Sequence, residues 1–283
     1  MKLEVKNISQ IYSKKTPFER RAVNDVSLTI EGNEFIGLIG HTGSGKSTLI
    51  QHFNGLIKPA QGQVLIDGED IHSSKEALRR SRTRVGLVFQ YPEYQLFEET
   101  VYKDIAFGPK NMKLSSDEID RRVRSSLKFV GLSEDILERS PFELSGGQKR
   151  RVAIAGVIAM EPELLILDEP TAGLDPKGSA EIMDFVSGYV DENHSVLFVS
   201  HSMNDIAKYA KRVLVMNDSQ LIMDGSVPEI FSQAARLKEI GLDVPQITEI
   251  FIRLKNLGYR LPTDVYTGKY ALKRILEYKG VAK

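Results

Sequence analysis

Cysteine is absent from this chain of 283 residues. Disulfide bonds, zinc sites built on thiolates and catalysis by a thiol are therefore excluded. Net charge is absent as well, because 38 Lys and Arg side chains balance 38 Asp and Glu. This balance disfavours a strongly basic nucleic-acid binder, although a local basic patch remains open. No stretch approaches the roughly 18 apolar residues of a membrane span, and Met1–Lys6 lacks the apolar run of a secretion signal. What is present is an ordinary globular composition, with 41% apolar residues.

Short aliphatic runs alternate with longer helical patterns along the chain. Because several runs show no polar alternation, they predict strands buried on both faces of a mostly parallel sheet. The helical patterns between them predict an α/β layered domain. The runs are Phe35–Ile39, Val64–Ile66, Val85–Phe89, Leu164–Leu167, Val196–Val199 and Val213–Met216.

The chain is predicted to divide into a domain over residues 3–240 and a small C-terminal appendage over residues 241–283. Within the domain, residues 91–160 are poor in aliphatic runs and rich in helical pattern, which predicts a helical subdomain. The appendage carries two apolar helical stripes, one from Ile247 to Gly258 and one around Leu272. Two placements of these helices remain open: against the chain's own domain, or against a second subunit as a dimerisation element.

The residues that follow Phe35–Ile39 fit the phosphate-binding pattern G-x-x-x-x-G-K-[ST], and a helical pattern comes next, as this motif requires. Its glycines let successive backbone amides point at one phosphate, and the helix start adds positive potential. Lys46 is predicted to contact the β- and γ-phosphates of a nucleotide, and the Ser47 hydroxyl to bind Mg²⁺. The candidate binding residues are Gly40, His41, Thr42, Gly43, Ser44, Gly45, Lys46, Ser47 and Thr48.

Two acidic residues end the aliphatic run Leu164–Leu167. Asp168 and Glu169 are expected at the carboxyl end of a strand, where α/β sheets bind their ligands. One carboxylate, Asp168, is predicted to hold the Mg²⁺ shell. The other, Glu169, is predicted to take a proton from an attacking water.

A serine-glycine segment precedes the helical pattern Arg151–Met160. Ser145 is a candidate cap for this helix, and Gly146 and Gly147 leave its first amides open, which predicts a second anion site. The sequence Leu144-Ser-Gly-Gly-Gln148, followed by a strand that ends in Asp-Glu-Pro-Thr171, resembles the signature of ATP-binding cassette (ABC) ATPases. The resemblance implies a P-loop NTPase core of the ABC type with a helical subdomain, and it covers about Leu3 to Leu237.

The resemblance assigns further residues to ATP and Mg²⁺. Gln90 is similar to the glutamine that reaches the metal and the attacking water, so Ser47, Gln90 and Asp168 become the metal candidates. His201 is similar to the switch histidine at the γ-phosphate and joins Glu169 and Gln90 as a catalytic candidate. In this family the signature closes on ATP held by a partner chain, which places Ser145–Gln148 and Asp175 at a neighbouring nucleotide. Tyr12 resembles the aromatic residue that stacks on adenine.

The segment Gln90–Gly108, together with Thr16–Arg20 and the added tail, is similar to the ATPases of energy-coupling factor (ECF) transporters, more narrowly to the second of their two related ATPase subunits. Tyr91, Tyr94, Leu96 and Phe97 are either core of the helical subdomain or the lining of a groove for a partner helix. The resemblance implies a related ATPase as heterodimer partner, a transmembrane scaffold subunit, a substrate-binding membrane subunit, a place on the cytoplasmic face of the membrane, and uptake of a vitamin or similar micronutrient. No nucleic-acid partner is expected. The alternatives are a soluble ABC ATPase that acts on nucleic acid, or the ATPase of a cobalt or nickel importer.

Overall fold

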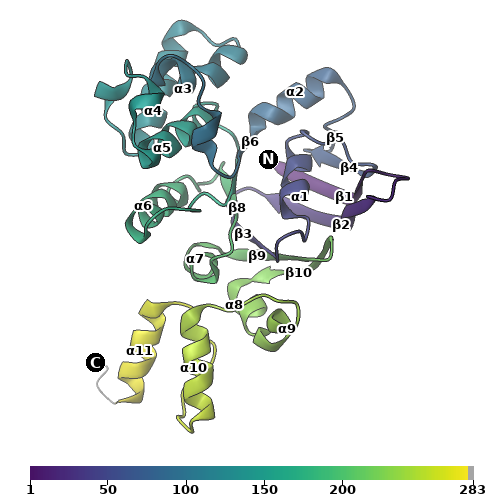
Figure 1. The fold of residues 1–283 in the computed structure, drawn as a ribbon, viewed down its shortest axis with the longest axis vertical. Helices are drawn as coiled ribbons and strands as arrows, with labels where there is room; N and C mark the ends of the chain where they lie inside the picture. Colours follow the sequence, from purple (N-terminus) through teal and green to yellow (C-terminus); the bar gives the residue numbers. More distant parts are fainter. Residues whose placement is uncertain (280–283) are drawn as a thin grey trace. The chain divides into compact units, whose positions relative to one another are not determined.

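The computed structural model describes residues 1–279 (Figure 1). The chain forms two compact units. Unit 1 contains Met1–Glu34 and Ser47–Val199, and unit 2 contains Phe35–Lys46 and the chain from Ser200 onward. The division falls inside the phosphate-binding motif, immediately after Lys46. Among the described residues, no helix has the length and hydropathy needed to cross a membrane.

Unit 1 contains an antiparallel sheet of four strands in the order β2-β1-β4-β5. Its strands are β1 (Lys2–Tyr12), β2 (Arg20–Glu31), β4 (Gln61–Ile66) and β5 (Glu69–Asp70). Leu3 of β1 pairs with Ile30 on one side and with Ile66 on the other. Val64–Ile66 therefore lies in an antiparallel sheet and not in the predicted parallel one. A run of three apolar residues shows burial but contains no information on the direction of the neighbouring strand.

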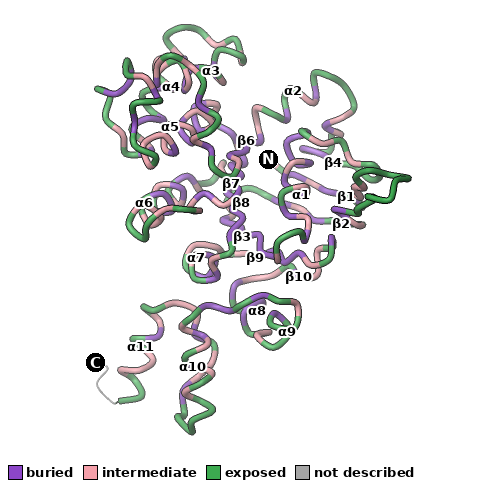
Figure 2. The backbone as a smooth tube through the Cα atoms, viewed as in Figure 1, coloured by how far each residue is buried: buried purple, intermediate pink, exposed green. Residues whose placement is uncertain are grey.

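Three parallel strands of unit 1 follow the order β8-β7-β6. They are β6 (Val85–Val88), β7 (Leu164–Asp168) and β8 (Ser195–Val199), and every residue in them is buried (Figure 2). The sequence prediction of doubly covered strands is confirmed here. The helices α1 (Lys46–Phe53), α2 (Lys75–Arg84) and α6 (Pro176–Ser187) alternate with these strands along the chain.

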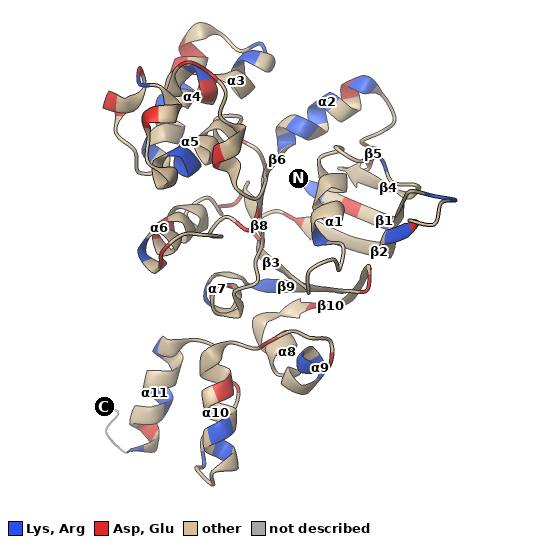
Figure 3. Ribbon diagram, in the orientation of Figure 1, with Lys and Arg blue, Asp and Glu red and all other residues tan. Residues whose placement is uncertain are grey.

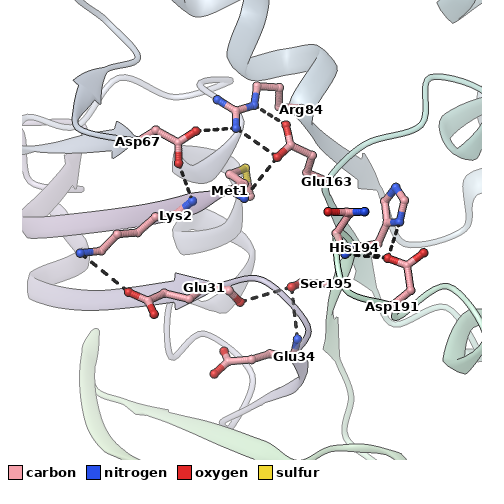
Figure 4. Close-up of polar contacts among 11 residues, drawn as sticks. Met1, Lys2, Glu31, Glu34, Asp67, Arg84, Glu163, Asp191, His194 and Ser195 are labelled. Carbon is pink, nitrogen blue, oxygen red and sulfur yellow. Dashed lines mark hydrogen bonds and ion pairs between the residues drawn. The ribbon is translucent and has the colours of Figure 1, made fainter.

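Polar contacts fasten the amino ends of these strands (Figure 4). Arg84, just before β6, donates to Glu163, just before β7, over 2.5 Å and to Asp67 over 2.6 Å. The amino group of Met1 lies 3.3 Å from Glu163. The hydrogen bond from Arg84 lowers the pKa of Glu163, although burial opposes the shift. The amino ends are thus held by ion pairs, and the opposite, carboxyl ends remain available for a site.

Helices occupy the chain between β6 and β7. The α-helices are α3 (Val101–Asn111), α4 (Ser116–Phe129) and α5 (Gly146–Ile158), and they pack on one another (Figure 1). The side chains of Thr100, Ser115 and Ser145 cap their three starts. Short 3₁₀ helices, Pro92–Gln95, Glu134–Ile136 and Pro141–Glu143, connect them. The exact limits of a helical subdomain stay a prediction.

Unit 2 is built on β3 (Phe35–Ile39), β9 (Arg212–Asn217) and β10 (Gln220–Ser226). β3 pairs parallel with β9, and β10 pairs antiparallel with β9. Its helices are α7 (Met203–Tyr209), α8 (Val227–Phe231), α9 (Ala234–Glu239), α10 (Gln246–Asn256) and α11 (Gly268–Tyr278). The last two fit the predicted pair of appendage helices; residues 280–283 of the predicted appendage lie outside the described residues.

The two appendage helices share a small apolar cluster made of Phe251, Leu261, Val265 and Ala271. The buried hydroxyl of Thr248 donates to the carbonyl of Val265 over 2.6 Å, which ties α10 to the loop that follows it. Leu257 and Leu272 remain 75% and 60% exposed, so part of the apolar stripe of each helix lies on the surface of unit 2.

Candidate functional site

The phosphate-binding loop of unit 2 runs from the end of β3 to Lys46. Its lysine is 6% exposed and its Nζ donates to the carbonyls of Gly40 (2.7 Å) and His41 (3.0 Å). Gly43 and Gly45 adopt φ angles of 85° and 103°, which favour glycine. The buried Oγ of Ser44 has no hydrogen-bond partner in the structure. An anion bound at this loop would give the Ser44 hydroxyl the partner that buried polar groups ordinarily have.

Gly40 leaves no room for a side chain at the start of this loop. A Cβ at this position would lie 2.5 Å from both the Met216 carbonyl oxygen and the Ser44 Oγ. The His41 ring, at the same end of the loop, contacts two neighbouring groups. Its Nδ1 lies 2.8 Å from the Thr42 carbonyl, and its Nε2 lies 3.9 Å from Asp218. Both ring nitrogens of His41 thus lie near groups of unit 2.

Tyr12 lies beside the start of α1 in unit 1. Its hydroxyl is 3.5 Å from the Oγ1 of Thr48, the residue after Ser47. Tyr12 is 40% exposed at the end of β1, so its ring has a free face. The structure thus places the predicted stacking residue next to the predicted phosphate-binding helix.

The acidic pair of unit 1 follows β7. Asp168 is the last residue of the strand and is 8% exposed. Glu169 has a φ of 50°, in the left-handed region that a non-glycine residue rarely adopts, and its amide donates to the Val199 carbonyl over 3.1 Å. Gln90 donates from Nε2 to the Glu169 Oε2 over 3.1 Å. Two residues 79 positions apart thus meet at the carboxyl ends of β6 and β7, and the fixed backbone aims Glu169 at this point.

His201 lies on the same unit as the phosphate-binding loop. The amide of Ser200 donates to the carbonyl of Leu38 over 3.4 Å, two residues before Gly40. The residue before His201 is therefore hydrogen-bonded to β3 near the end of that strand. Its side chain is exposed. The structure places this predicted residue and the phosphate-binding loop in the same unit.

The serine-glycine segment starts α5 in unit 1, so this helix begins before the predicted Arg151. Ser145 Oγ accepts from the amide of Gln148 over 3.3 Å, and the Gln148 side chain accepts from the amide of Ser145 over 3.0 Å. Nothing lies within 4 Å of a Cβ built on Gly146 or Gly147. The first turn is open to a large ligand. Asp175 caps α6 instead, because its Oδ1 accepts from Gly178 over 2.7 Å.

Arg150 is a residue that the sequence reasoning did not single out. Its guanidinium is almost fully buried and donates to both carboxylate oxygens of Glu93, over 2.9 and 2.7 Å. It also donates to the carbonyls of Pro170 (3.3 Å) and Ala172 (2.6 Å). One side chain thus joins the signature helix to the segment that follows Gln90 and to the chain after Glu169.

No group of three or more His, Cys, Asp or Glu side chains within residues 1–279 is arranged to hold a metal ion. The predicted donors Ser47, Gln90 and Asp168 offer oxygens, the ligand type that Mg²⁺ prefers.

Comparison with known proteins gives the family. Residues 23–172 match the ABC transporter family. The chain is 53% identical, over 98% of its length and 97% of the relative, to the energy-coupling factor transporter ATP-binding protein EcfA2 of Clostridium tetani. The chain belongs to the ATP-binding proteins of ECF transporters. It is therefore a transport-coupled ABC ATPase, as the resemblance implied.

Solved structures agree with this fold. The cbiO1 protein of Clostridium perfringens, described as part of the ABC transporter complex cbiONQ, is 38% identical with a TM-score of 0.74, over 90% of this chain and 96% of that one. The ATP-binding cassette MJ0796, solved as a dimer bound to ADP and Pi, is 30% identical with a TM-score of 0.71, over 80% and 98% of the two chains. The predicted fold class is confirmed. Membership of a transport family also decides against the alternative of a soluble ATPase that acts on nucleic acid.

Proposed function

We propose that this ECF ATPase binds MgATP at its phosphate-binding loop and hydrolyses it with Glu169 as the general base. The hydrogen bond of 3.1 Å between Gln90 and Glu169, beside the buried Asp168, carries the proposal. Ser47, Gln90 and Asp168 hold Mg²⁺, whose charge offsets that of the phosphates when it is bound. Tyr12 stacks on the base.

The reaction follows from these positions. The Glu169 carboxylate takes a proton from water while the water oxygen forms a bond to the γ-phosphorus, and the bond from that phosphorus to the β-bridging oxygen breaks. The products are ADP and inorganic phosphate. Gln90 orients the water and Glu169 through its amide, His201 contacts the γ-phosphate, and Lys46 offsets charge on the β- and γ-phosphates.

A second chain completes each nucleotide site in this proposal. The open first turn of α5, formed by Ser145, Gly146, Gly147 and Gln148, covers ATP held by the partner, and Asp175 lies at the same interface. The dimeric relative bound to ADP and Pi supports this arrangement. We infer that the partner is a related ATPase subunit and that the exposed apolar residues of α10 and α11 contribute to the pairing. Deletion of Gly241–Lys283 is then expected to weaken pairing on gel filtration more than it lowers the melting temperature of the monomer.

An apolar groove of about 550 Å³ in unit 1 fits a helix of a transmembrane scaffold subunit. Phe97 and Phe107 form an edge-to-face pair at 5.0 Å in its wall and remain 59% and 46% exposed. Arg79 and Arg82 of the basic helix α2 also line it (Figure 3). Of the four residues considered in the sequence analysis, Leu96 and Phe97 line this groove, whereas Tyr91 and Tyr94 do not. This docking places the chain on the cytoplasmic face of the membrane, in a complex that also contains a substrate-binding subunit for a micronutrient.

The catalytic proposal is tested with Glu169→Gln in the assembled transporter. ATP binding is expected to persist, while hydrolysis falls by roughly 10²–10⁴-fold, the usual contribution of a general base. Gln90→Glu is a second variant for this experiment, because it replaces the amide that donates to Glu169 by a carboxylate of like charge. Near-normal turnover of Glu169→Gln would remove Glu169 from this role.

The docking proposal has a separate test. Phe97→Asp with Phe107→Asp puts charge into the groove and is expected to abolish recovery of the chain with the membrane subunits. Phe18→Asp is the matched control, since Phe18 is 82% exposed and lies outside the groove. Equal recovery of the two variants would contradict the groove as the docking site.

A further inference from the structure

The helix α10 begins without a cap of its own. Its N-cap residue is Pro245, which has no side-chain oxygen to accept a hydrogen bond. Instead, the amide of Gln246 donates to the Oδ1 of Asn204 over 3.0 Å. Asn204 belongs to α7, 42 residues earlier in the chain. The first turn of the appendage is therefore capped by a side chain from another element of unit 2.

Asn204 lies in the first turn of α7, directly after a hydrogen-bonded turn that contains His201. Ser202 donates its amide to the Ser200 Oγ over 3.0 Å, and its own Oγ accepts from the amide of Asp205 over 3.3 Å. The side chain of Met203, which follows this turn, is buried. His201 lies inside this segment and Asn204 lies three residues beyond it, so a displacement of Asn204 moves the backbone on which His201 stands.

His201 and the start of α10 line one cavity of about 840 Å³. On the appendage side, Lys238 of α9 pairs with Glu249 of α10 at 2.5 Å, and Arg253 lies 3.3 Å from the same carboxylate. This ion-pair cluster and the buried Thr248 fix the place of α10. The hydrogen bond from Gln246 to Asn204 joins the start of α10 to the helix that follows His201.

We propose that Asn204 is a positioning residue, which links the C-terminal appendage to the placement of His201 and thereby sets the rate of ATP hydrolysis. The inference rests on the proposed contact of His201 with the γ-phosphate. Without the link, the turn relaxes and the imidazole leaves its place, whereas the phosphate-binding loop is unchanged. Since small displacements of a reacting group reduce rates by up to about 10²-fold, Asn204→Ala lowers kcat by roughly 10- to 100-fold and leaves the KM for ATP within about twofold.

The experiment measures kcat and KM for ATP in the assembled transporter. Asn204→Asp keeps an acceptor for the amide of Gln246 and is expected to restore kcat. Asn256→Ala is the matched control, because Asn256 is an exposed residue at the last turn of the same helix, and its kcat is expected to equal that of the unaltered chain. A kcat for Asn204→Ala within twofold of the control would overturn the proposal.

A further variant separates positioning from a loss of stability. Pro245→Ser gives α10 a cap from its own chain, so Asn204→Ala with Pro245→Ser has a capped helix that is no longer tied to α7. Amide hydrogen exchange at Gln246–Glu249 verifies that the helix start is protected in this double variant. Hydrolysis is expected to stay slow. Recovery of full kcat would show that Asn204 only caps the helix, which overturns the proposal.

His201→Ala distinguishes this inference from the proposed function. If His201→Ala hydrolyses ATP slowly and Asn204→Ala is normal, the positioning role alone fails. If His201→Ala itself is normal, the assignment of His201 fails, and the link through Asn204 fails with it.

Discussion

Replacing Arg150 by Met tests whether one buried guanidinium holds the hydrolytic segment and the signature helix together. The side chain of Arg150 is 3% exposed, that of Glu93 is 16% exposed, and the pair is bidentate. Methionine fills much of the volume but leaves the carboxylate of Glu93 and two carbonyls without donors. Breaking a buried pair from one side costs about 3–5 kcal/mol, because the remaining charge is uncompensated. The melting temperature then falls by roughly 2–4 °C for each kcal/mol.

Thermal unfolding followed by circular dichroism measures this loss. Arg150→Lys keeps the charge but not the planar guanidinium. Its melting temperature is expected to lie between those of Arg150→Met and the unaltered chain. Arg150→Met with Glu93→Gln removes the stranded charge and should recover part of the stability, which a double-mutant cycle quantifies. A loss below about 1 kcal/mol for Arg150→Met, as for an exposed ion pair, would refute the reasoning.

The Arg150–Glu93 pair also determines the direction in which stability changes with pH. Burial opposes ionisation of Glu93, but the hydrogen bonds from Arg150 prevail and hold its pKa below the usual value. A carboxyl with a lowered folded pKa contributes stability above its unfolded pKa of 4.5 and loses it as the pH falls through the folded value. Arg150→Met therefore flattens the acid limb of the stability curve. An unchanged limb would show that Glu93 ionises without help from Arg150.

Three further substitutions have defined outcomes. Gly40→Ala forces a Cβ to within 2.5 Å of the Met216 carbonyl oxygen. Overpacking of about 1–3 kcal/mol should weaken ATP binding by roughly 5- to 140-fold in calorimetric titration. Unchanged affinity would contradict the geometry. Lys46→Ala removes hydrogen bonds of a charged donor, worth about 1.5–3 kcal/mol, so ATP affinity should fall by roughly 10- to 100-fold, and an unaltered affinity would exclude Lys46 from the site. Burial lowers the pKa of His52 below 6.5, so its contribution to stability is present above that pH and is lost as the pH falls. His52→Leu should therefore reduce the loss of stability between about pH 7 and pH 5, measured by thermal unfolding. Identical stability curves for the variant and the unaltered chain would argue against His52 as the titrating group.

The strand, loop and helix around Lys46 were predictable because the pattern that specifies them is local. The glycines, Lys46 and Ser47 are consecutive, and the strand before them is a continuous aliphatic run. The pattern therefore contains both the backbone geometry and the charge that the loop needs. Likewise, Asp168 and Glu169 follow a buried strand directly, so their place at a strand end follows from the sequence alone.

Other features depend on contacts across the chain. Glu93 and Arg150 are 57 residues apart, and neither spacing nor residue type indicates that they pair. The direction of β4 depends on β1, which no local pattern of Val64–Ile66 contains. The cap on α10 comes from Asn204, whereas local capping rules examine only the residues around Pro245. In each case, tertiary packing decides what a short window of sequence leaves open.

The two predicted anion sites of the chain differ in strength, and this difference favours the proposed sharing of a nucleotide between two chains. The phosphate-binding loop has the buried ammonium of Lys46 as well as its amides. The signature helix has amides alone at its tip, since Ser145 and Gln148 cap each other and the nearby Arg150 is occupied by Glu93. A helix start contributes about 0.3–1 kcal/mol to a bound anion, up to about 2 kcal/mol where it is partly buried. This is a factor of roughly 2 to 30 in affinity. Such a site is too weak to capture ATP from solution, but it is strong enough to favour a closed pair over an open one once the partner's loop holds the triphosphate. In the proposed dimer, loss of the γ-phosphate removes that preference, so hydrolysis at the phosphate-binding loop of one chain releases the signature helix of the other.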